Sequence, residues 1–295
     1  MVSANIDASA GKPQFSHRVN IASGIIASTI TDVVFIPMEL LKIRMQQCKT
    51  RMSGWQMARD IYKKEGWFGF YRGSLFGFIF LGVVSTARLY TYRYLHYFSE
   101  RYELMSHYPV RILASSFIVG LITSISMNPL EHIRIKAVSP EFSVALTGSI
   151  KAAQYIVKNY GFIALQKAYP YAFAREFIFH IVFFHTYEST KDYFNRLNKP
   201  GLGLTMASLV ASPLAWFTVY PIDTIKTNLQ GDSLKNPKWT ATRYLNHLRS
   251  ENDLRSLYRG LPSIVFRSAV VNLIFLVSWE KSLVWLQKIE DSHSI

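Results

Sequence analysis

Three short segments of the chain combine a proline, an acid and a base at one spacing. They are Pro37-Met38-Glu39-Leu40-Leu41-Lys42, Pro129-Leu130-Glu131-His132-Ile133-Arg134 and Pro221-Ile222-Asp223-Thr224-Ile225-Lys226. The prolines lie 92 residues apart each time, which is typical of a threefold internal repeat. An acid and a base three residues apart lie on one face of a helix, and a proline bends the helix at that point.

These charges interrupt apolar runs, and charged side chains are costly in a bilayer unless they pair. We therefore expect the acid of each repeat to pair with the base of a neighbouring repeat, so that a ring closes one end of a central cavity. The ring residues are Glu39, Lys42, Glu131, Arg134, Asp223 and Lys226. The alternative is an ordinary surface pair on each helix, which three copies at equal period disfavour.

The apolar runs predict the elements that must position these residues. We expect spans at about 17–47, at 73–98, from near 108 through a bend at 129, and at 169–195, 202–229 and 261–287. Short amphipathic helices at about 52–64, 144–158 and 240–249 suit a membrane surface. The predicted fold is a single all-α membrane domain of six transmembrane helices, with repeats at 16–105, 106–199 and 200–290.

Composition narrows the class of protein. Hydrophobic residues make up 49% of the 295 residues, and the formal net charge is +14. Such a charge suits nucleic acid or anionic phospholipid, and the apolar spans favour lipid over nucleic acid. Cys48 is the single cysteine, so an internal disulfide is excluded. The scattered histidines and the lack of a catalytic constellation argue against an enzyme, a metal site or a cofactor.

The triple motif resembles the mitochondrial carrier family, and the resemblance covers nearly the whole chain. Gln46 and Gln230 follow Lys42 and Lys226 by four residues, where the family places a glutamine that braces the salt bridge. A second family motif, acid-Gly and then aromatic-base-Gly, is matched by Glu65-Gly66 with Tyr71-Arg72-Gly73 and partly by Tyr258-Arg259-Gly260. Only Gly161 and Lys167 remain of it in the second repeat.

This resemblance implies a small-molecule solute carrier of the inner mitochondrial membrane, with both termini toward the intermembrane space. The ring would lie near the matrix end, made in the outward-open state and broken in the inward-open state. The family also implies bound cardiolipin at helix starts, where backbone donors suit phosphate. The residues expected there are Gly54, Gly148, Arg72, Gly73, Arg259 and Gly260, although Met52 and Leu146 replace the aromatic residue of the lipid motif.

Repeat-equivalent positions that differ break the threefold symmetry, as an asymmetric substrate requires. By resemblance the substrate contact points are Phe80, Arg175 with Glu176, and Arg267, and Asp32 stands five residues before Pro37, where Ser124 and Trp216 stand in the other repeats. An arginine followed by an acid is the pattern of carriers for amino acids and their derivatives, and the local stretches look most like S-adenosylmethionine carriers.

The charges of these residues suit a zwitterion or an amino-acid-derived cation. We expect Arg175 and Arg267 to bind a carboxylate, while Asp32 and Glu176 face a cationic group. The alternative is that Arg175 and Glu176 pair with each other or with a neighbouring helix.

The opposite gate departs from the family pattern of aromatic, acid, two residues and base. Tyr187-Glu188 with Lys191 is complete, whereas Trp279-Glu280 lacks the base and Tyr92-Arg93 has lost the acid. The cytoplasmic gate expected from Glu188, Lys191 and Glu280 is therefore incomplete. The second interpretation is a carrier-like protein that has lost transport and serves as a structural subunit of a larger inner-membrane complex.

Overall fold

The computed structural model describes residues 17–48, 52–71, 108–138, 149–198, 200–235 and 237–268, with individual positions between 270 and 286. These residues form α-helices, short 3-10 helices and their connections, with no strand among them. The expectation of an all-α fold is therefore confirmed for the described part of the chain. The predicted second span at 73–98 lies outside it.

The long helices carry the proline motifs or connect them. They are α1 (His17–Gln47), α4 (Tyr108–Val138), α6 (Tyr169–Arg196) and α7 (Pro200–Gly231). Residues 261–268 begin a further helix. Pro37, Pro129 and Pro221 lie inside α1, α4 and α7, and each helix continues through its proline.

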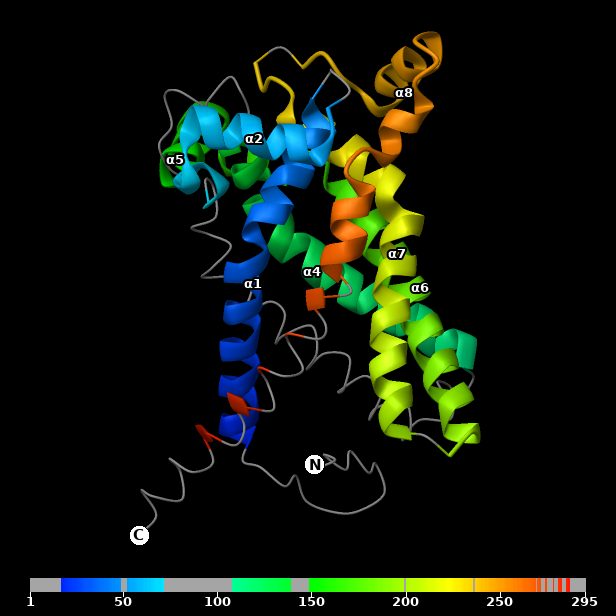
Figure 1. Ribbon diagram of the computed structural model, residues 1–295. Coiled ribbons are helices and arrows are strands. Elements are labelled where there is room, and N and C mark those ends of the chain that lie inside the picture. The colour runs from blue at the N-terminus through cyan, green and yellow to red at the C-terminus, as the bar shows by residue number, and fades with distance from the viewer. Residues whose placement is uncertain are drawn as a thin grey trace.

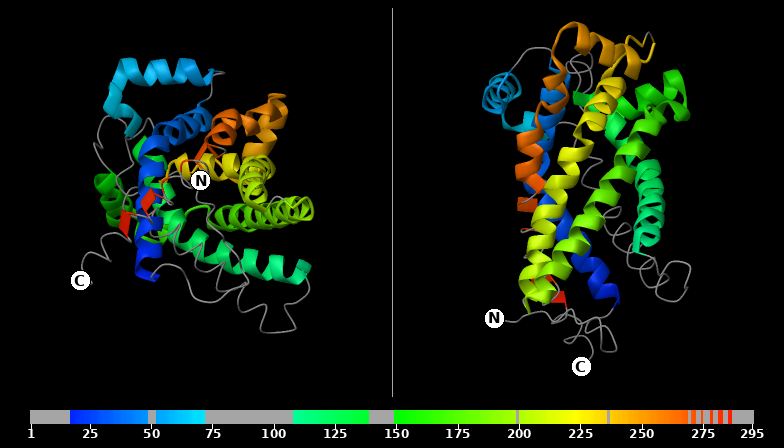
Figure 2. Two further views of the ribbon diagram at one scale, coloured as in Figure 1. Left: turned by 60° about the horizontal axis from the view of Figure 1, so that its bottom comes forward. Right: turned by 90° about the vertical axis from the view of Figure 1, so that its right-hand side faces the viewer.

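A short helix and a 3-10 helix follow each proline-bearing helix. The pairs are α2 (Gly54–Glu65) with η1 (Trp67–Tyr71), α5 (Ser149–Tyr160) with η3 (Phe162–Gln166), and α8 (Ala241–Ser250) with η4 (Leu254–Tyr258). The short helices gather at the end of the molecule where α1, α4 and α7 finish (Figure 1), and the turned views in Figure 2 show the same grouping. This end is called the ring end below.

Side-chain caps set where two of the short helices begin. Ser53 Oγ accepts a hydrogen bond from the backbone N–H of Gln56 at 3.2 Å, and the Ser53 N–H donates to Gln56 Oε1 at 2.9 Å. This capping box satisfies two donors at the start of α2. Thr240 Oγ1 accepts from the Arg243 N–H at 3.3 Å at the start of α8. The predicted boundaries at 52 and 240 therefore precede the helices themselves by one or two residues.

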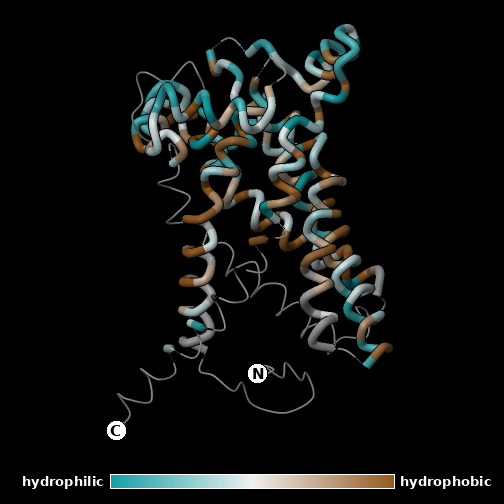
Figure 3. The backbone as a smooth tube through the Cα atoms, viewed as in Figure 1, coloured by the Kyte–Doolittle hydropathy of each residue, from teal (hydrophilic) through white to brown (hydrophobic). Residues whose placement is uncertain are grey.

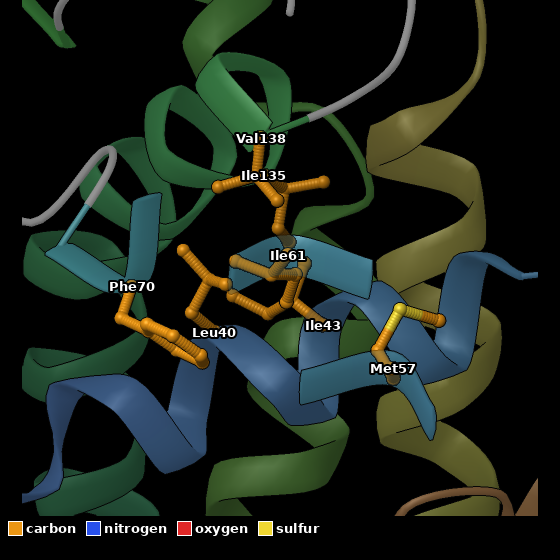
Figure 4. Close-up of a cluster of buried hydrophobic side chains, with 7 residues drawn as sticks. All are labelled: Leu40, Ile43, Met57, Ile61, Phe70, Ile135 and Val138. Carbon is orange, nitrogen blue, oxygen red and sulfur yellow. The ribbon is translucent and has the colours of Figure 1, made fainter. Parts of the chain in front are cut away.

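An apolar cluster packs the first two repeats together at the ring end (Figure 4). Its buried residues come from α1, α2, η1 and α4, and they are Leu40, Ile43, Met57, Ile61, Phe70, Ile135 and Val138. Burying an aliphatic or aromatic side chain of this size stabilises a fold by about 1.5–3 kcal/mol. Smaller clusters fix α5 against α4 and α8 against α7 in the same way.

The long helices are more hydrophobic than the short helices at the ring end (Figure 3). In α4, Val110–Val138 is long and apolar enough to cross a bilayer. The long helices also expose large apolar side chains, among them Val34, Phe117 and Phe217. Lipid is a suitable environment for these faces because apolar patches of this kind are unusual on soluble proteins.

Candidate functional site

The proline motifs bring six charged side chains together at the ring end. Lys42 Nζ lies 2.6 Å from Asp223 Oδ2, and Arg134 Nη1 lies 2.5 Å from Glu39 Oε2. Lys226 Nζ pairs with Glu131 Oε2. Each base therefore binds the acid of another repeat, and the three ion pairs form a closed cycle through α1, α7 and α4. This is the pairing expected from the spacing of the motifs.

Burial makes these pairs depend on one another. The side chains of Lys42, Asp223 and Lys226 are almost completely buried, whereas Glu131 keeps 29% of its side chain exposed. Removing one partner of a buried ion pair leaves an uncompensated charge, which costs about 3–5 kcal/mol. Each buried ion pair of the ring therefore requires both of its members.

Of the two predicted glutamine braces, Gln46 contacts the ring. Its Nε2 donates to Asp223 Oδ2 at 2.9 Å and to Thr224 Oγ1 at 3.3 Å. Gln230 Nε2 donates instead to Asn128 Oδ1 at 2.8 Å and to the Lys167 carbonyl at 3.1 Å. The expected contact of Gln230 with the ring pair is therefore not made in this structure.

The position of Asn128 explains this difference. Asn128 precedes Pro129 in α4, at a position held by Ile36 and Tyr220 in the other repeats, and it offers Gln230 an amide oxygen. Both carboxylate oxygens of Glu131 already have cationic partners, so a hydrogen bond from Gln230 is not needed to satisfy them. The asparagine next to the proline is the feature of the sequence that could have indicated this hydrogen bond with Gln230.

Arg175 on α6 is bound directly to the ring. Its Nη1 donates to Asp223 Oδ1 at 3.0 Å, and its Nη2 donates to Glu131 Oε1 at 3.0 Å. Nη2 also pairs with the neighbouring Glu176. The guanidinium thus bridges acids of the second and third repeats. In this conformation Arg175 pairs with Glu176 and with acids on neighbouring helices, which is the alternative considered above for these two residues.

Glu176 is held by residues on two helices. Thr123 Oγ1 on α4 lies 3.4 Å from Glu176 Oε2, while its hydroxyl proton is donated to the Val119 carbonyl at 2.6 Å. One turn further along α6, His180 Nδ1 lies 2.7 Å from the Glu176 backbone carbonyl and 3.8 Å from Glu176 Oε2. The carboxylate therefore lies beside Arg175, and its contact with Thr123 was not predicted from the spacing of residues.

Arg267, in the helical stretch 261–268, makes weaker contacts than Arg175. Its Nη1 lies 3.9 Å from Glu39 Oε1, while the other oxygen of Glu39 binds Arg134. Its Nε is buried and has no hydrogen-bond partner among the described residues. Since a guanidinium has five N–H donors, Arg267 has donors available for an anionic group next to the ring.

Several predicted site residues lie outside the described residues. They are Phe80, Glu280, Arg72, Gly73 and Gly148. Asp32 belongs to α1, but its side chain is not among those described.

At the opposite end of the long helices, Glu188 forms an ion pair within its own repeat. Arg111 Nη2 near the start of α4 donates to Glu188 Oε2 on α6 at 2.9 Å. Lys191, the predicted basic residue of that gate, follows one turn later on α6. Arg111 was not predicted as a gate residue, although a basic residue in the first turn of an apolar span could have indicated it.

Of the predicted lipid contacts, Gly54 is the first residue of α2, and Arg259 is engaged inside the protein. Arg259 Nη1 donates to the Cys48 carbonyl at 2.9 Å, and its Nη2 pairs with Asp253. The Arg259 backbone N–H donates to the Ser256 carbonyl at 3.1 Å. The expected phosphate donor at this position is therefore already used.

Gly260 is constrained by its backbone and its surroundings. It has a φ of 86°, and a Cβ at this position would lie 2.8 Å from the Tyr220 hydroxyl oxygen. The Tyr220 hydroxyl in turn donates to the Arg259 carbonyl at 2.6 Å. Close packing against α7 accounts for this glycine.

The arrangement suits binding and gating rather than bond chemistry. Two arginines and a fixed carboxylate lie against ion pairs that join three helices. A solute with an anionic group that binds these arginines would alter the ion pairs directly, because they share the same acids. None of the described residues forms a cluster suited to a metal ion.

Comparison with known proteins gives a consistent result over the whole chain. A family model described as mitochondrial carrier protein matches residues 14–102, 106–198 and 199–290. The mitochondrial substrate carrier family protein S of Dictyostelium discoideum is 26% identical, covering 83% of this chain and 89% of that protein.

Two relatives from Schizosaccharomyces pombe have substrates in their names. The glutamate/glycine mitochondrial carrier ymc1 is 25% identical over 88% of this chain and 91% of its own length. The mitochondrial ornithine transporter 1 is 25% identical over 85% of this chain and 87% of its own length.

Proposed function

Because the chain belongs to the mitochondrial carrier family, we propose that it transports an amino acid or an amino-acid-derived metabolite by alternating access. Members of this family are multi-pass transporters of small solutes in the inner mitochondrial membrane, and they are not enzymes.

The observation that carries the proposal is that the predicted substrate residues share acids with the ring. Arg175 binds Glu131 and Asp223, and Arg267 approaches Glu39. A carboxylate bound to either arginine weakens its attraction to a ring acid, because the solute and the acid compete for the same guanidinium. Binding of the solute is thereby coupled to opening of the ring.

The substrate class follows from the charges around the ring. Arg267, with its available donors, binds the carboxylate of the solute, and Arg175 joins it when the ring opens. Glu176 and Asp32 bind the amino group or another cationic group such as a sulfonium. The glutamate/glycine and ornithine carriers named among the relatives handle solutes with these groups, and an S-adenosylmethionine-like solute carries them as well.

The gating cycle follows from the state of the ring. With its three pairs made, the ring closes the matrix side, and the site is open toward the intermembrane space. Breaking the pairs opens the matrix side, and Glu188, Lys191 and Glu280 contribute to closing the cytoplasmic side. In this orientation both termini face the intermembrane space.

Anionic phospholipid, with cardiolipin as the specific lipid, binds at the helix starts near the ring end. Gly54 follows the capped Ser53 at the start of α2, where the helix dipole favours a phosphate. Gly148, Arg72, Gly73 and Gly260 are the further candidates. Added cardiolipin should raise the thermal stability of the purified protein, and no change would contradict this part of the proposal.

The test of function is uptake by purified protein in liposomes. Amino acids, S-adenosylmethionine, nucleotides and keto acids should be offered separately, and an amino-acid-like solute should be taken up. In Arg267→Ala, apparent affinity should fall about tenfold to a hundredfold, because a charge-assisted hydrogen bond contributes about 1.5–3 kcal/mol. Arg243→Ala, at an exposed arginine of α8, is the matched control and should behave as wild type.

Two outcomes would contradict the proposal. Transport of adenine nucleotides without any amino-acid-like solute would refute the substrate class. No transport of any solute, together with purification at fixed stoichiometry in a large complex, would support the structural role instead.

A further inference from the structure

Trp216 on α7 contacts the ring, although it is not one of the ring residues. Lys42 Nζ lies 4.5 Å from the centroid of the Trp216 ring and 5.6 Å from that of Tyr220. An ammonium this close to an indole makes a cation–π contact. Lys42 therefore has two kinds of partner in the closed ring, the Asp223 carboxylate and aromatic rings.

Another neighbour of Trp216 lies on α6, the helix that carries the predicted substrate residues Arg175 and Glu176. The Phe179 ring on α6 lies 5.4 Å from it, centroid to centroid, with 62° between the planes. Phe179 is four residues beyond Arg175 and therefore shares its helix face. Trp216 thus lies between the ring lysine and the stretch of α6 that carries Arg175 and Glu176.

The repeat position of Trp216 also sets it apart. It stands five residues before Pro221, where the first repeat has Asp32 and the second has Ser124. An indole is larger than either side chain, and its π face attracts cations without carrying a charge of its own. The third repeat therefore contributes an uncharged cation-binding group.

We propose that Trp216 is a specificity-determining residue. Its indole binds the Lys42 ammonium when the three ion pairs are made, and it binds the cationic group of the solute after Lys42 has moved away from the indole. The inference rests on the proposed function and adds a residue to its site. The chemical class that it selects is an onium cation, either an ammonium or a sulfonium, in preference to a neutral group of the same shape.

This exchange gives a cationic solute an effect on gating that a neutral solute lacks. The cation of the solute competes with Lys42 for the same indole and removes one contact that stabilises the closed ring. By thermodynamic linkage, binding of the cation then favours the open ring. A neutral analogue leaves the contact between Lys42 and Trp216 in place.

The experiment compares matched solutes that differ in one charge. Uptake into liposomes is measured with the two members of a pair in competition. One pair is S-adenosylmethionine and S-adenosylhomocysteine, the other is ornithine and norvaline, and the preference is the ratio of uptake of the cationic member to that of its partner. In Trp216→Leu, the preference for the cationic member should fall about threefold to thirtyfold, the range expected for a partly desolvated cation–π contact. Trp216→Phe keeps a π face and should retain part of the preference.

The matched control is Trp55→Leu, at an indole on α2 that is 79% exposed. This variant should keep the wild-type preference. If the wild-type protein takes up a cationic solute and Trp216→Leu keeps the same ratio, the inference is wrong and the proposed function stands. If the wild-type protein takes up another amino acid but none of the four solutes, this inference is wrong and the proposed function stands. If it takes up no amino-acid-like solute at all, the proposed substrate class fails and this inference fails with it.

Discussion

The ring and the layer next to it, at the C-terminal ends of α1, α4 and α7, differ in symmetry. In the ring, every repeat contributes one acid and one base, and all three bases pair with the acid of another repeat. In the end layer, the residues two positions after the ring bases are Arg44, Lys136 and Asn228, and they bond in three different ways. The ring reflects the repeat, whereas the end layer reflects how the repeats have diverged.

Arg44 and Lys136 show the divergence most clearly. Arg44 pairs with Glu65 of its own repeat at 2.6 Å. Tyr160 stands at the position of Glu65 in the second repeat. Lys136 instead crosses to the third repeat, where its Nζ donates to the carbonyls of Gly231 at 3.0 Å and Asp232 at 2.6 Å.

The helix ends are tied to neighbouring repeats by cations. Lys167 donates to the Asp232 carbonyl at 2.9 Å, which adds a second lysine to the end of α7. Arg259 holds the end of α1 through the Cys48 carbonyl at 2.9 Å. Basic side chains at these places satisfy the last carbonyls and complement the helix dipole. We therefore expect the second and third repeats to separate less readily at this end than the third and the first.

Loss of a ring acid should have the largest effect. Asp223→Asn leaves Lys42 buried without its carboxylate partner and removes one of the three carboxylates around Arg175, so we expect transport to be abolished and stability to fall by about 3–5 kcal/mol. Uptake and thermal unfolding measure the two effects. A charge exchange, Lys42→Asp with Asp223→Lys, should restore part of the transport.

Its control is an acid of the same type in an exposed pair. Asp60 pairs with Lys64 on the surface of α2 at 2.9 Å. Asp60→Asn should cost at most about 1 kcal/mol and leave transport intact. Wild-type transport by Asp223→Asn would show that the ring is dispensable.

The two site arginines should differ in the kind of effect that they have. Arg175→Gln removes a cation from three carboxylates and should lower both stability and transport. Arg267→Gln should lower apparent affinity by about tenfold to a hundredfold and change stability little. The ratio of the affinity change to the shift in melting temperature separates the two, and equal ratios would contradict the distinction.

The effect of removing an acid predicted to face the cationic group should depend on the charge of the solute. Asp32→Asn and Glu176→Gln should weaken binding of a cationic solute by about tenfold or more. Competition with a neutral analogue measures the effect on the charge alone. Wild-type transport by Asp32→Asn together with Arg267→Ala would remove the amino-acid assignment.

The end layer should respond asymmetrically and more weakly than the ring. Lys136→Gln should cost about 1–2 kcal/mol and shift the equilibrium toward the open ring, because it frees the end of α7 from the second repeat. Arg44→Gln should cost a similar amount without the same shift, since its partner lies in its own repeat. Reactivity of a cysteine introduced next to the ring reports the shift, and equal shifts in both variants would contradict the asymmetry.

The smallest effect is expected at the opposite end of the helices. Arg111 and Glu188 are partly exposed, and such pairs contribute about 0–1 kcal/mol. Arg111→Gln should therefore leave thermal stability nearly unchanged. It should favour the inward-open state slightly because Glu188 becomes available to the cytoplasmic gate, which the same cysteine assay can detect.

Periodicity predicted the helices and the ring because both depend on spacing along one chain. The face of α1 that carries Glu39 and Lys42 follows from residue spacing alone. Partners across helices do not follow in this way. The sequence placed Arg175 and Gln230 at plausible positions, but their choice of Glu131 and Asn128 depends on side-chain reach and on which oxygens are already occupied.

Arg175 also constrains how the polypeptide enters the membrane during biogenesis. Its partner Glu131 on α4 also binds Lys226 on α7, so the carboxylates of Glu131 and Glu176 share the one guanidinium of Arg175 until α7 has followed α6. A charged residue near the centre of an inserted helix costs about 2.5–3.5 kcal/mol on insertion scales. Insertion of α6 and α7 as one hairpin avoids most of this cost, and a chain truncated between them would expose a charge that quality-control proteases can recognise.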